Sequence, residues 1–291
     1  DLPMKAITVL RWTGGALAAA AALWALVAGS MTDARRNGLA IEHLHRLEEL
    51  QAGASESVLK LRYGLTNNYD GMNQLVLQMQ ASRTSLGVGE DAIIGRGNDR
   101  IDALFKDYTA ALDDYRVRLE QFKSRNAVLK NSLQHFSAAA SDVREQLKPG
   151  DRSRDFDDHL GRLLFATLRF ATGSDEDLLP VITGETARVR EGVGRLPGDM
   201  QKRVGNILDH AEVIVRVRPE LDQLTRELVF PKIAQSLDDL SEGVGEVAQA
   251  QERRAVGFRY ALGLLAATLL GLVVAAVVRI ARNMRQIEIG R

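Results

Sequence analysis

The densest group of hydrogen-bonding side chains in the sequence lies between positions 62 and 70. Its members are Arg62, Tyr63, Asn67, Asn68, Tyr69 and Asp70. A guanidinium can hold a carboxylate or a phenolate, tyrosine rings can stack on another ring, and amides and a carboxylate can orient polar substituents. The same side chains could instead satisfy one another as an interhelical network inside a bundle. These residue types therefore predict either a site for a small polar molecule or a structural network, and the sequence leaves both open.

A second polar group follows further along the chain, where Arg125, Asn126 and Asn131 are interleaved with apolar residues. Asn126 falls on a stripe with helical spacing that also contains Phe122, Leu129, Leu133 and Phe136. A buried asparagine needs hydrogen-bond partners. We expect Asn126 either to pair with Asn68 on a neighbouring helix or to line a binding pocket.

The sequence also contains an internal repeat with an offset of 107 positions. Residues from Leu61 to Leu75 match residues from Leu168 to Ile182 in the pattern L-R-[YF]-x6-D-x-[ML]-x2-[LI]. Amphipathicity alone does not require the Arg-aromatic pair or the aspartate, so the match favours duplication of a helical module. In the second copy, the counterparts of the first polar group are Arg169, Phe170 and Asp177.

No catalytic or metal-binding motif accompanies these groups. The five histidines are scattered, and His43 and His45 lie on different faces of a helix because they are two positions apart. The glycine-rich stretch at 87–97 lacks the Lys-Ser or Lys-Thr of a phosphate-binding loop. With 38 basic and 38 acidic residues and no cysteine, the chain favours neither nucleic-acid binding nor a disulfide framework. We expect no metal, no cofactor and no enzymatic centre within these residues.

Two apolar blocks enclose the polar groups. Each is about 20 residues long, which is enough to cross about 30 Å of hydrocarbon as a helix. Basic residues precede the first block and follow the second, and this pattern places both termini in the cytoplasm. We therefore expect a cytoplasmic N-terminus at 1–11, a span at 12–31, an extracytoplasmic region at 32–257, a span at 258–278 and the start of a cytoplasmic region at 279–291.

The region between the blocks is predicted to be all helical, because apolar residues recur at helical spacing and strand-forming residues are sparse. One predicted stripe, which would place the 62–70 group on a helix, is formed by Leu61, Leu65, Met72, Leu75 and Met79. Turns are expected at Gly53 and at Arg218–Pro219, and an interruption at Pro231. The predicted fold is all-α: an extracytoplasmic bundle of two stacked four-helix-type modules, at about 53–148 and about 151–250, between two transmembrane helices.

The two polar motifs suggest a family. LRYGLTNNYD at 61–70 and FKSRNAVLKNSL at 122–133 resemble the double all-helical ligand-binding (DAHL) domain, the extracytoplasmic sensor of VirA-type transmembrane histidine kinases. The resemblance covers roughly residues 34–250 and implies sensing without naming a ligand. It also implies that residues 32–257 are periplasmic and that the two spans lie in a bacterial inner membrane. Two departures stand out: Ser137 follows Phe136 where family members often have proline, and the second copy has Ala171 and Thr172 where the first has Gly64 and Leu65.

Together, these observations predict the ligand-sensing and signalling region of a two-component sensor histidine kinase whose catalytic part would lie beyond Arg291. Expected partners are a small-molecule ligand or a periplasmic binding protein, the membrane, and a second copy of the chain in a homodimer. Two alternatives remain open from the sequence. The output could be that of a chemoreceptor or a diguanylate cyclase, or the chain could be a structural envelope protein that binds partners through helix faces and senses nothing.

Overall fold

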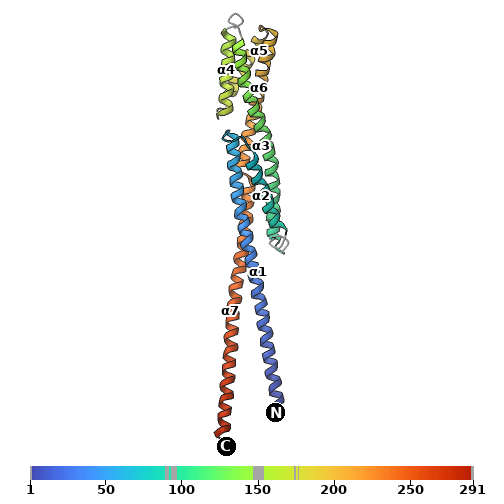
Figure 1. Ribbon diagram of the computed structural model, residues 1–291, viewed down its shortest axis with the longest axis vertical. Coiled ribbons are helices and arrows are strands. Elements are labelled where there is room, and N and C mark those ends of the chain that lie inside the picture. The colour runs from blue at the N-terminus through green and yellow to red at the C-terminus, as the bar shows by residue number, and fades with distance from the viewer. Residues whose placement is uncertain are drawn as a thin grey trace. The chain divides into compact units, whose positions relative to one another are not determined.

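The computed structural model describes residues 2–88, 92, 97–146, 154–173, 175 and 177–289. Side chains before 35 are described only at 21, 24 and 25, and beyond 275 only at 278. Within these residues the fold is all-α, as predicted, and contains no strand. The seven helices are α1 (Leu2–Arg62), α2 (Asp70–Gly87), α3 (Asp99–Gln146), α4 (Arg154–Thr172), α5 (Leu178–Val193), α6 (Gly198–Val229) and α7 (Lys232–Ile289) (Figure 1).

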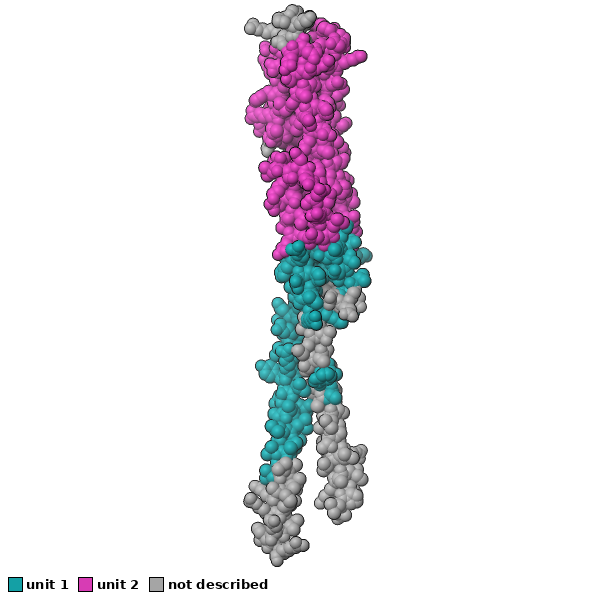
Figure 2. All heavy atoms as spheres, in the orientation of Figure 1, with its two compact units in different colours: residues 1–48, 80–108, 236–291 teal, residues 49–79, 109–235 magenta. Residues whose placement is uncertain are grey.

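The helices contribute to two compact units, which Figure 2 shows in different colours. Unit 1 comprises residues 1–48, 80–108 and 236–291, and unit 2 comprises residues 49–79 and 109–235. Each unit is therefore assembled from segments that are distant in the sequence, whereas the predicted modules were consecutive stretches. The module boundaries at 53–148 and 151–250 stay a prediction.

Unit 2 has a core of apolar stripes from α1, α2, α3 and α6, and its helices α4, α5 and α6 also pack against one another. In α3 the predicted stripe faces inward, since Phe122, Asn126, Leu129 and Phe136 are all buried. In α6 the inward positions follow spacings of three and four, which is the pattern of a helix with one buried face. They include Ile207, Ala211, Ile214, Leu221 and Leu228.

Unit 1 has a smaller core, contributed by one stretch from each of α1, α2, α3 and α7. Its buried residues include Leu44, Leu86, Ile101, Tyr108 and Leu240. Gly243 in α7 lies where a Cβ would come within 2.7 Å of the Leu104 Cδ1 atom on α3. The absence of a side chain at Gly243 therefore lets α3 and α7 approach closely.

Two predicted turns prove to be wrong, because Gly53 and Pro219 both lie inside helices. Gly53 faces α2, where a Cβ would meet Leu75 at 3.5 Å. Pro219 removes one backbone hydrogen bond, at a cost of about 3 kcal/mol in a helix interior. The buried residues on either side of it, Ile214 and Leu221, pack in the core and hold α6 continuous.

The chain does break at Phe230–Pro231, between α6 and α7. Phe230 leaves the helical region with φ −117° and ψ 65°, as expected for a residue that precedes proline. Its side chain is exposed. The interruption that the sequence predicted at Pro231 is confirmed, and it separates two helices.

Within the described residues, one helical stretch, Gly198–Ala275, contains a window long and apolar enough to cross a membrane. The window has a mean hydropathy of 1.9 and none of it is buried. It belongs to the end of α7, where Tyr260, Leu264, Leu270 and Leu272 are all exposed. The predicted first span, 12–31, has a helical backbone in α1, but most of its side chains lie outside the described residues.

Candidate functional site

The first polar group covers the end of α1, the loop at 63–69 and the start of α2, and does not lie on one helix as the stripe through Leu65 suggested. Gly64 has φ +72°, in the left-handed region that only glycine adopts without strain. The amide of Leu65 donates to the Lys60 carbonyl (2.9 Å) and the amide of Gly64 to the Leu61 carbonyl (3.4 Å), which together form a Schellman helix end. The glycine in the Arg62–Asp70 segment therefore ends the helix.

Side-chain oxygens then turn the chain into α2. The Thr66 hydroxyl accepts a hydrogen bond from the Asn68 amide (3.2 Å), and the Asn68 side chain accepts one from the Asp70 amide (2.7 Å). Such local bonds are how asparagine and threonine shape turns. Asn68 is thus occupied by its own backbone, and its predicted pairing with Asn126 is wrong.

The outer face of this loop is open to solvent. Tyr63 is 68% exposed and Leu65 is 77% exposed. Asn67, Asn68 and Asp70 are exposed as well. The loop therefore presents an aromatic ring, an aliphatic side chain and amides on one short surface, a composition that suits contact with a partner.

Beneath the loop, Asn126 satisfies the need of a buried amide for partners. It is 1% exposed, and its Nδ2 atom donates to the Tyr69 hydroxyl (3.0 Å) and to the Leu61 carbonyl (3.3 Å). Lys130, one turn further along α3, donates to the Asn67 side chain (2.9 Å). Asn126 and Lys130 of α3 therefore fix the α1–α2 loop to α3 through side-chain hydrogen bonds.

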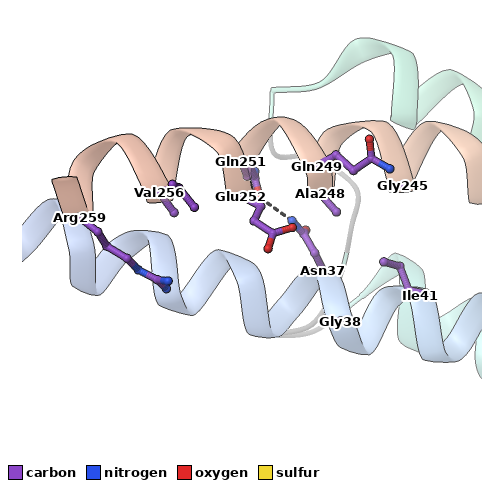
Figure 3. Close-up of a pocket in the computed structure, with 11 residues that line it drawn as sticks. Asn37, Gly38, Ile41, Gly245, Ala248, Gln249, Gln251, Glu252, Val256 and Arg259 are labelled. Atoms are coloured by element: carbon purple, nitrogen blue, oxygen red, sulfur yellow. Dashed lines mark hydrogen bonds between the residues drawn. The ribbon is translucent and has the colours of Figure 1, made fainter. Parts of the chain in front are cut away.

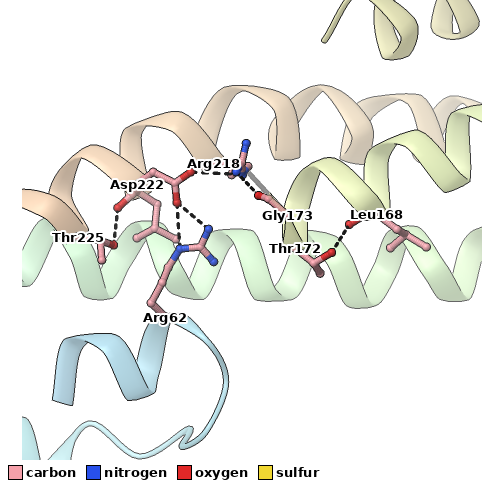
Figure 4. Close-up of polar contacts among 8 residues, drawn as sticks. Arg62, Leu168, Thr172, Gly173, Arg218, Asp222 and Thr225 are labelled. Atoms are coloured by element: carbon pink, nitrogen blue, oxygen red, sulfur yellow. Dashed lines mark hydrogen bonds and ion pairs between the residues drawn. The ribbon is translucent and has the colours of Figure 1, made fainter. Parts of the chain in front are cut away.

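Arg62 points away from these amides, toward α6. Its Nε and Nη2 atoms both donate to Asp222 Oδ1, at 3.2 and 2.7 Å. The other carboxylate oxygen of Asp222 lies 3.3 Å from Arg218 Nε, one turn earlier in α6. Figure 4 shows the two guanidinium groups on either side of this single carboxylate. The Arg62, Asp222 and Arg218 side chains are 12%, 27% and 6% exposed, so the cluster is largely shielded from water.

Arg218 connects this cluster to the second copy of the repeat. Its guanidinium lies 4.4 Å from the centre of the Phe170 ring and donates to the carbonyl of Gly173, which follows the last residue of α4. A cation over an aromatic face and beside the carbonyl end of a helix is favourable on both counts. The Nε atom of Arg218 is nevertheless buried without a hydrogen bond.

The cluster carries more positive than negative charge. Two arginines share one carboxylate, and partial burial together with the charge of Arg62 lowers the pKa of nearby Lys130. A lowered lysine pKa means that its positive charge is disfavoured where it sits. A cluster with surplus cations and an unused buried donor is chemically suited to a small anion such as a carboxylate.

The remaining predicted residues have other roles. Arg125 pairs with Glu220 of α6 at 3.0 Å, and Asn131 is exposed. In the second copy, Arg169 pairs with Asp175 at 2.7 Å, Phe170 supports Arg218, and Asp177 precedes α5 without a side-chain capping bond. The repeat thus places matching residues at two helix ends, but only Arg62 of its two arginines enters the cluster.

Arg218 and Asp222 were not among the predicted site residues. The signal that could have identified Arg218 is its place on the buried stripe of α6, between Ile214 and Leu221. A charged residue on an apolar stripe requires a partner, and Asp222 is one helical turn away. Because Pro219 was interpreted as a turn, the helical stripe that contains Arg218 was not recognised.

Among the described residues, no cluster of three or more His, Asp or Glu side chains could hold a metal ion. The class that the fold and the site define is a helical domain with a shielded polar cluster at the ends of its helices. A family model confirms this class: the DAHL domain model matches residues 32–259, and the chain belongs to the DAHL domain family. DAHL domains are extracytoplasmic sensor domains. Neither the curated proteins nor the solved structures with which the chain was compared gave a match.

Proposed function

We propose that the chain is the sensing region of a transmembrane histidine kinase, and that it binds a small anionic molecule, such as an organic acid, at the cluster of Arg62, Asp222 and Arg218. The observation that carries the ligand class is the sharing of one carboxylate by two shielded arginines. A bound carboxylate would supply the missing negative charge and accept a hydrogen bond from Arg218 Nε, which lies 3.3 Å from Asp222 but makes no hydrogen bond.

Three further elements complete this proposal. The apolar part of α7 and the apolar block within α1 anchor the chain in an inner membrane, with both termini in the cytoplasm. Two copies associate as a homodimer, and a catalytic domain beyond Arg291 receives the signal. The positive-inside charge pattern and the membership of the sensor family support this arrangement.

The signal would be a shift between two arrangements of α6. A ligand can move such an equilibrium only by binding one arrangement more tightly than the other. Asp222 and Arg218 are both on α6, whereas their partners Arg62 and Gly173 lie at the ends of α1 and α4. An anion that shares Arg62 and Arg218 with Asp222 would therefore change how tightly α6 is held to the end of α1.

A binding protein is the second candidate partner, and the exposed α1–α2 loop favours it. The apolar and amide groups at Tyr63, Leu65 and Asn67 offer a contact surface above the cluster. A non-sensing scaffold is the third candidate function, and the hydrogen bond from the Asn126 amide to the Tyr69 hydroxyl favours it, because this contact needs no ligand.

Thermal unfolding of the 291-residue chain in nanodiscs distinguishes these candidates. A ligand at 100 times its Kd raises the free energy of unfolding by about 2.7 kcal/mol. We expect organic acids, but not neutral sugars, to raise the Tm of the wild type, and Arg62→Gln to abolish that increase while Arg169→Gln preserves it. Stabilisation by a binding protein alone would favour the second candidate, and no stabilisation by either would favour a scaffold.

A further inference from the structure

Unit 1 contains a cavity of about 460 Å³ between α1 and α7. Its walls are Asn37, Gly38 and Ile41 on α1, and a face of α7 from Gly245 to Arg259. Its size falls in the range of small-molecule sites. A hydrogen bond from the Asn37 amide to Gln251 spans the two helices at the cavity (Figure 3).

Two opposite charges line this cavity. Glu252 and Arg259 are both exposed, and no ion pair is found for either among the described residues. They are seven residues apart, or about 10.5 Å along a helix. Figure 3 shows Glu252 and Arg259 both extending from α7 into the space beside α1. Long helical side chains lean toward the N-terminus of their helix, so Arg259 reaches in the direction of Glu252.

Arg259 and Glu252 lie at different distances from the apolar segment of α7. Arg259 is the last charged residue before the uncharged run from Tyr260 to Val278, which contains the apolar window of α7. Glu252 lies two helical turns further from that run. Moving away from the apolar segment, the cavity thus presents a cation first and an anion second.

A phospholipid with an ethanolamine head group has the complementary order. Beyond its acyl chains comes a phosphate, and beyond the phosphate an ammonium. Arg259 would bind the phosphate with charge-assisted hydrogen bonds, and Glu252 would accept from the ammonium. The amides of Asn37 and Gln251, and the apolar walls at Ile41 and Val256, would contact the atoms between.

We propose that the α1–α7 cavity binds a phosphate-ammonium head group, supplied by phosphatidylethanolamine of the membrane in which α7 is anchored. The three N–H donors of a primary ammonium suit a carboxylate, whereas a trimethylated ammonium has none. Glu252 would therefore select ethanolamine over choline, and Arg259 alone would not. The site shares no residue with the cluster of Arg62 and Asp222 in unit 2, so its test does not depend on anion sensing there; it rests on the proposed anchoring of α7 in the membrane.

The test uses the whole chain in detergent, titrated with short-chain phosphatidylethanolamine, phosphatidylcholine, phosphatidylglycerol and free phosphoethanolamine, with binding followed by native mass spectrometry. We expect phosphatidylethanolamine to bind at least tenfold more tightly than phosphatidylcholine or phosphatidylglycerol. Glu252→Gln should remove the preference over choline, and Arg259→Gln should weaken all phospholipids. Stronger binding of free phosphoethanolamine than of the lipid would overturn the membrane source and assign the site to a soluble molecule.

Two control variants and one variant that fills the cavity make the result specific. Glu242→Gln and Arg254→Gln change exposed charges of α7 outside the cavity, and both should bind like the wild type. Gly38→Leu fills the cavity from α1, where a Cβ meets no atom within 4 Å, and should abolish selective binding without unfolding the chain. If Gly38→Leu instead changes the dimer dissociation constant and leaves lipid binding intact, the cavity is an interface for a second copy and the proposal is wrong.

Discussion

Asp222 is the residue on which the polar cluster of unit 2 depends, because each of its two oxygens faces a different arginine. Removing its charge would leave Arg62 and Arg218 facing each other with little water to screen them. Partly buried charges that lose a partner cost more than the same loss at the surface. This difference can be measured.

We expect Asp222→Asn to lower the free energy of unfolding by about 2 kcal/mol, and Arg62→Gln to lower it by less, because Asp222 keeps Arg218 as a partner. The control is Asp175→Asn, which breaks the exposed pair with Arg169 and should cost under about 1 kcal/mol. Urea denaturation of the three variants checks this order. Equal losses for Asp222→Asn and Asp175→Asn would show that the cluster is as solvated as the surface.

Tyr108 and Tyr115 predict how stability responds to alkaline pH. Burial raises the pKa of both phenols, so the folded chain holds their protons more tightly than the unfolded chain does. The free energy of unfolding should therefore fall as the pH rises above about 10, by up to about 1.4 kcal/mol per pH unit for each tyrosine.

Denaturation between pH 9 and pH 11 checks this expectation in the double variant Tyr108→Phe, Tyr115→Phe, whose stability should fall less steeply than that of the wild type. Tyr63→Phe is the matched control for loss of one tyrosine hydroxyl, because the Tyr63 side chain is exposed. Parallel curves for the wild type and the double variant would contradict the burial of these hydroxyl groups.

At the scale of the helix, α5 shows how one glycine is required and another is not. A Cβ at Gly192 would lie 2.6 Å from Cδ2 of the Phe156 ring on α4, and a ring cannot bend away. A Cβ at Gly184, two turns earlier in α5, would meet no atom within 4 Å. Close packing of α4 on α5 therefore depends on Gly192.

We expect Gly192→Ala to destabilise the chain by about 1–3 kcal/mol, as overpacking does. Gly184→Ala should instead stabilise it by up to about 1 kcal/mol, because alanine is the better helix former. Thermal unfolding of the two variants gives the comparison. A stabilising Gly192→Ala would mean that α4 and α5 pack less closely than described.

The helices show which features could be predicted from sequence. Periodicity predicted an all-α chain and the inward face of α3 through Phe122, Asn126 and Phe136, because burial of one face leaves a regular pattern. Periodicity missed the loop at Gly64, because the apolar stripe continued across the turn. The tendency of glycine to end a helix was not taken into account. Gly53 and Pro219 were also interpreted as turns, although tertiary packing holds both inside helices.

The site was harder to predict than the helices. Arg62, Tyr69 and Asn126 were identified from their types, and the structure joins the last two directly. The main partner of Arg62 lies 160 positions away, on α6. Local spacing carries no information about a contact of that kind, which depends on how three helices pack in three dimensions.

At the scale of the whole molecule, the proposed membrane topology can be tested by labelling introduced cysteines. The chain contains no cysteine, so a single introduced cysteine reports its own location. In intact cells, a membrane-impermeant maleimide should label Asn131→Cys, an exposed position of α3, and should label Ile287→Cys only after lysis. Labelling of Ile287→Cys before lysis would contradict a cytoplasmic C-terminus, and failure to label Asn131→Cys before lysis would contradict the assignment of residues 32–257 to the periplasm.

The most direct test of anion sensing is a calorimetric titration of the whole chain in nanodiscs with the organic acid that raises its Tm most. We predict one binding site per chain in unit 2, with a Kd weakened at least tenfold by Arg62→Gln and unchanged by Arg169→Gln. Both variants remove one arginine that pairs with an aspartate, but only Arg62 belongs to the shielded cluster. Binding that survives Arg62→Gln unchanged would contradict the account.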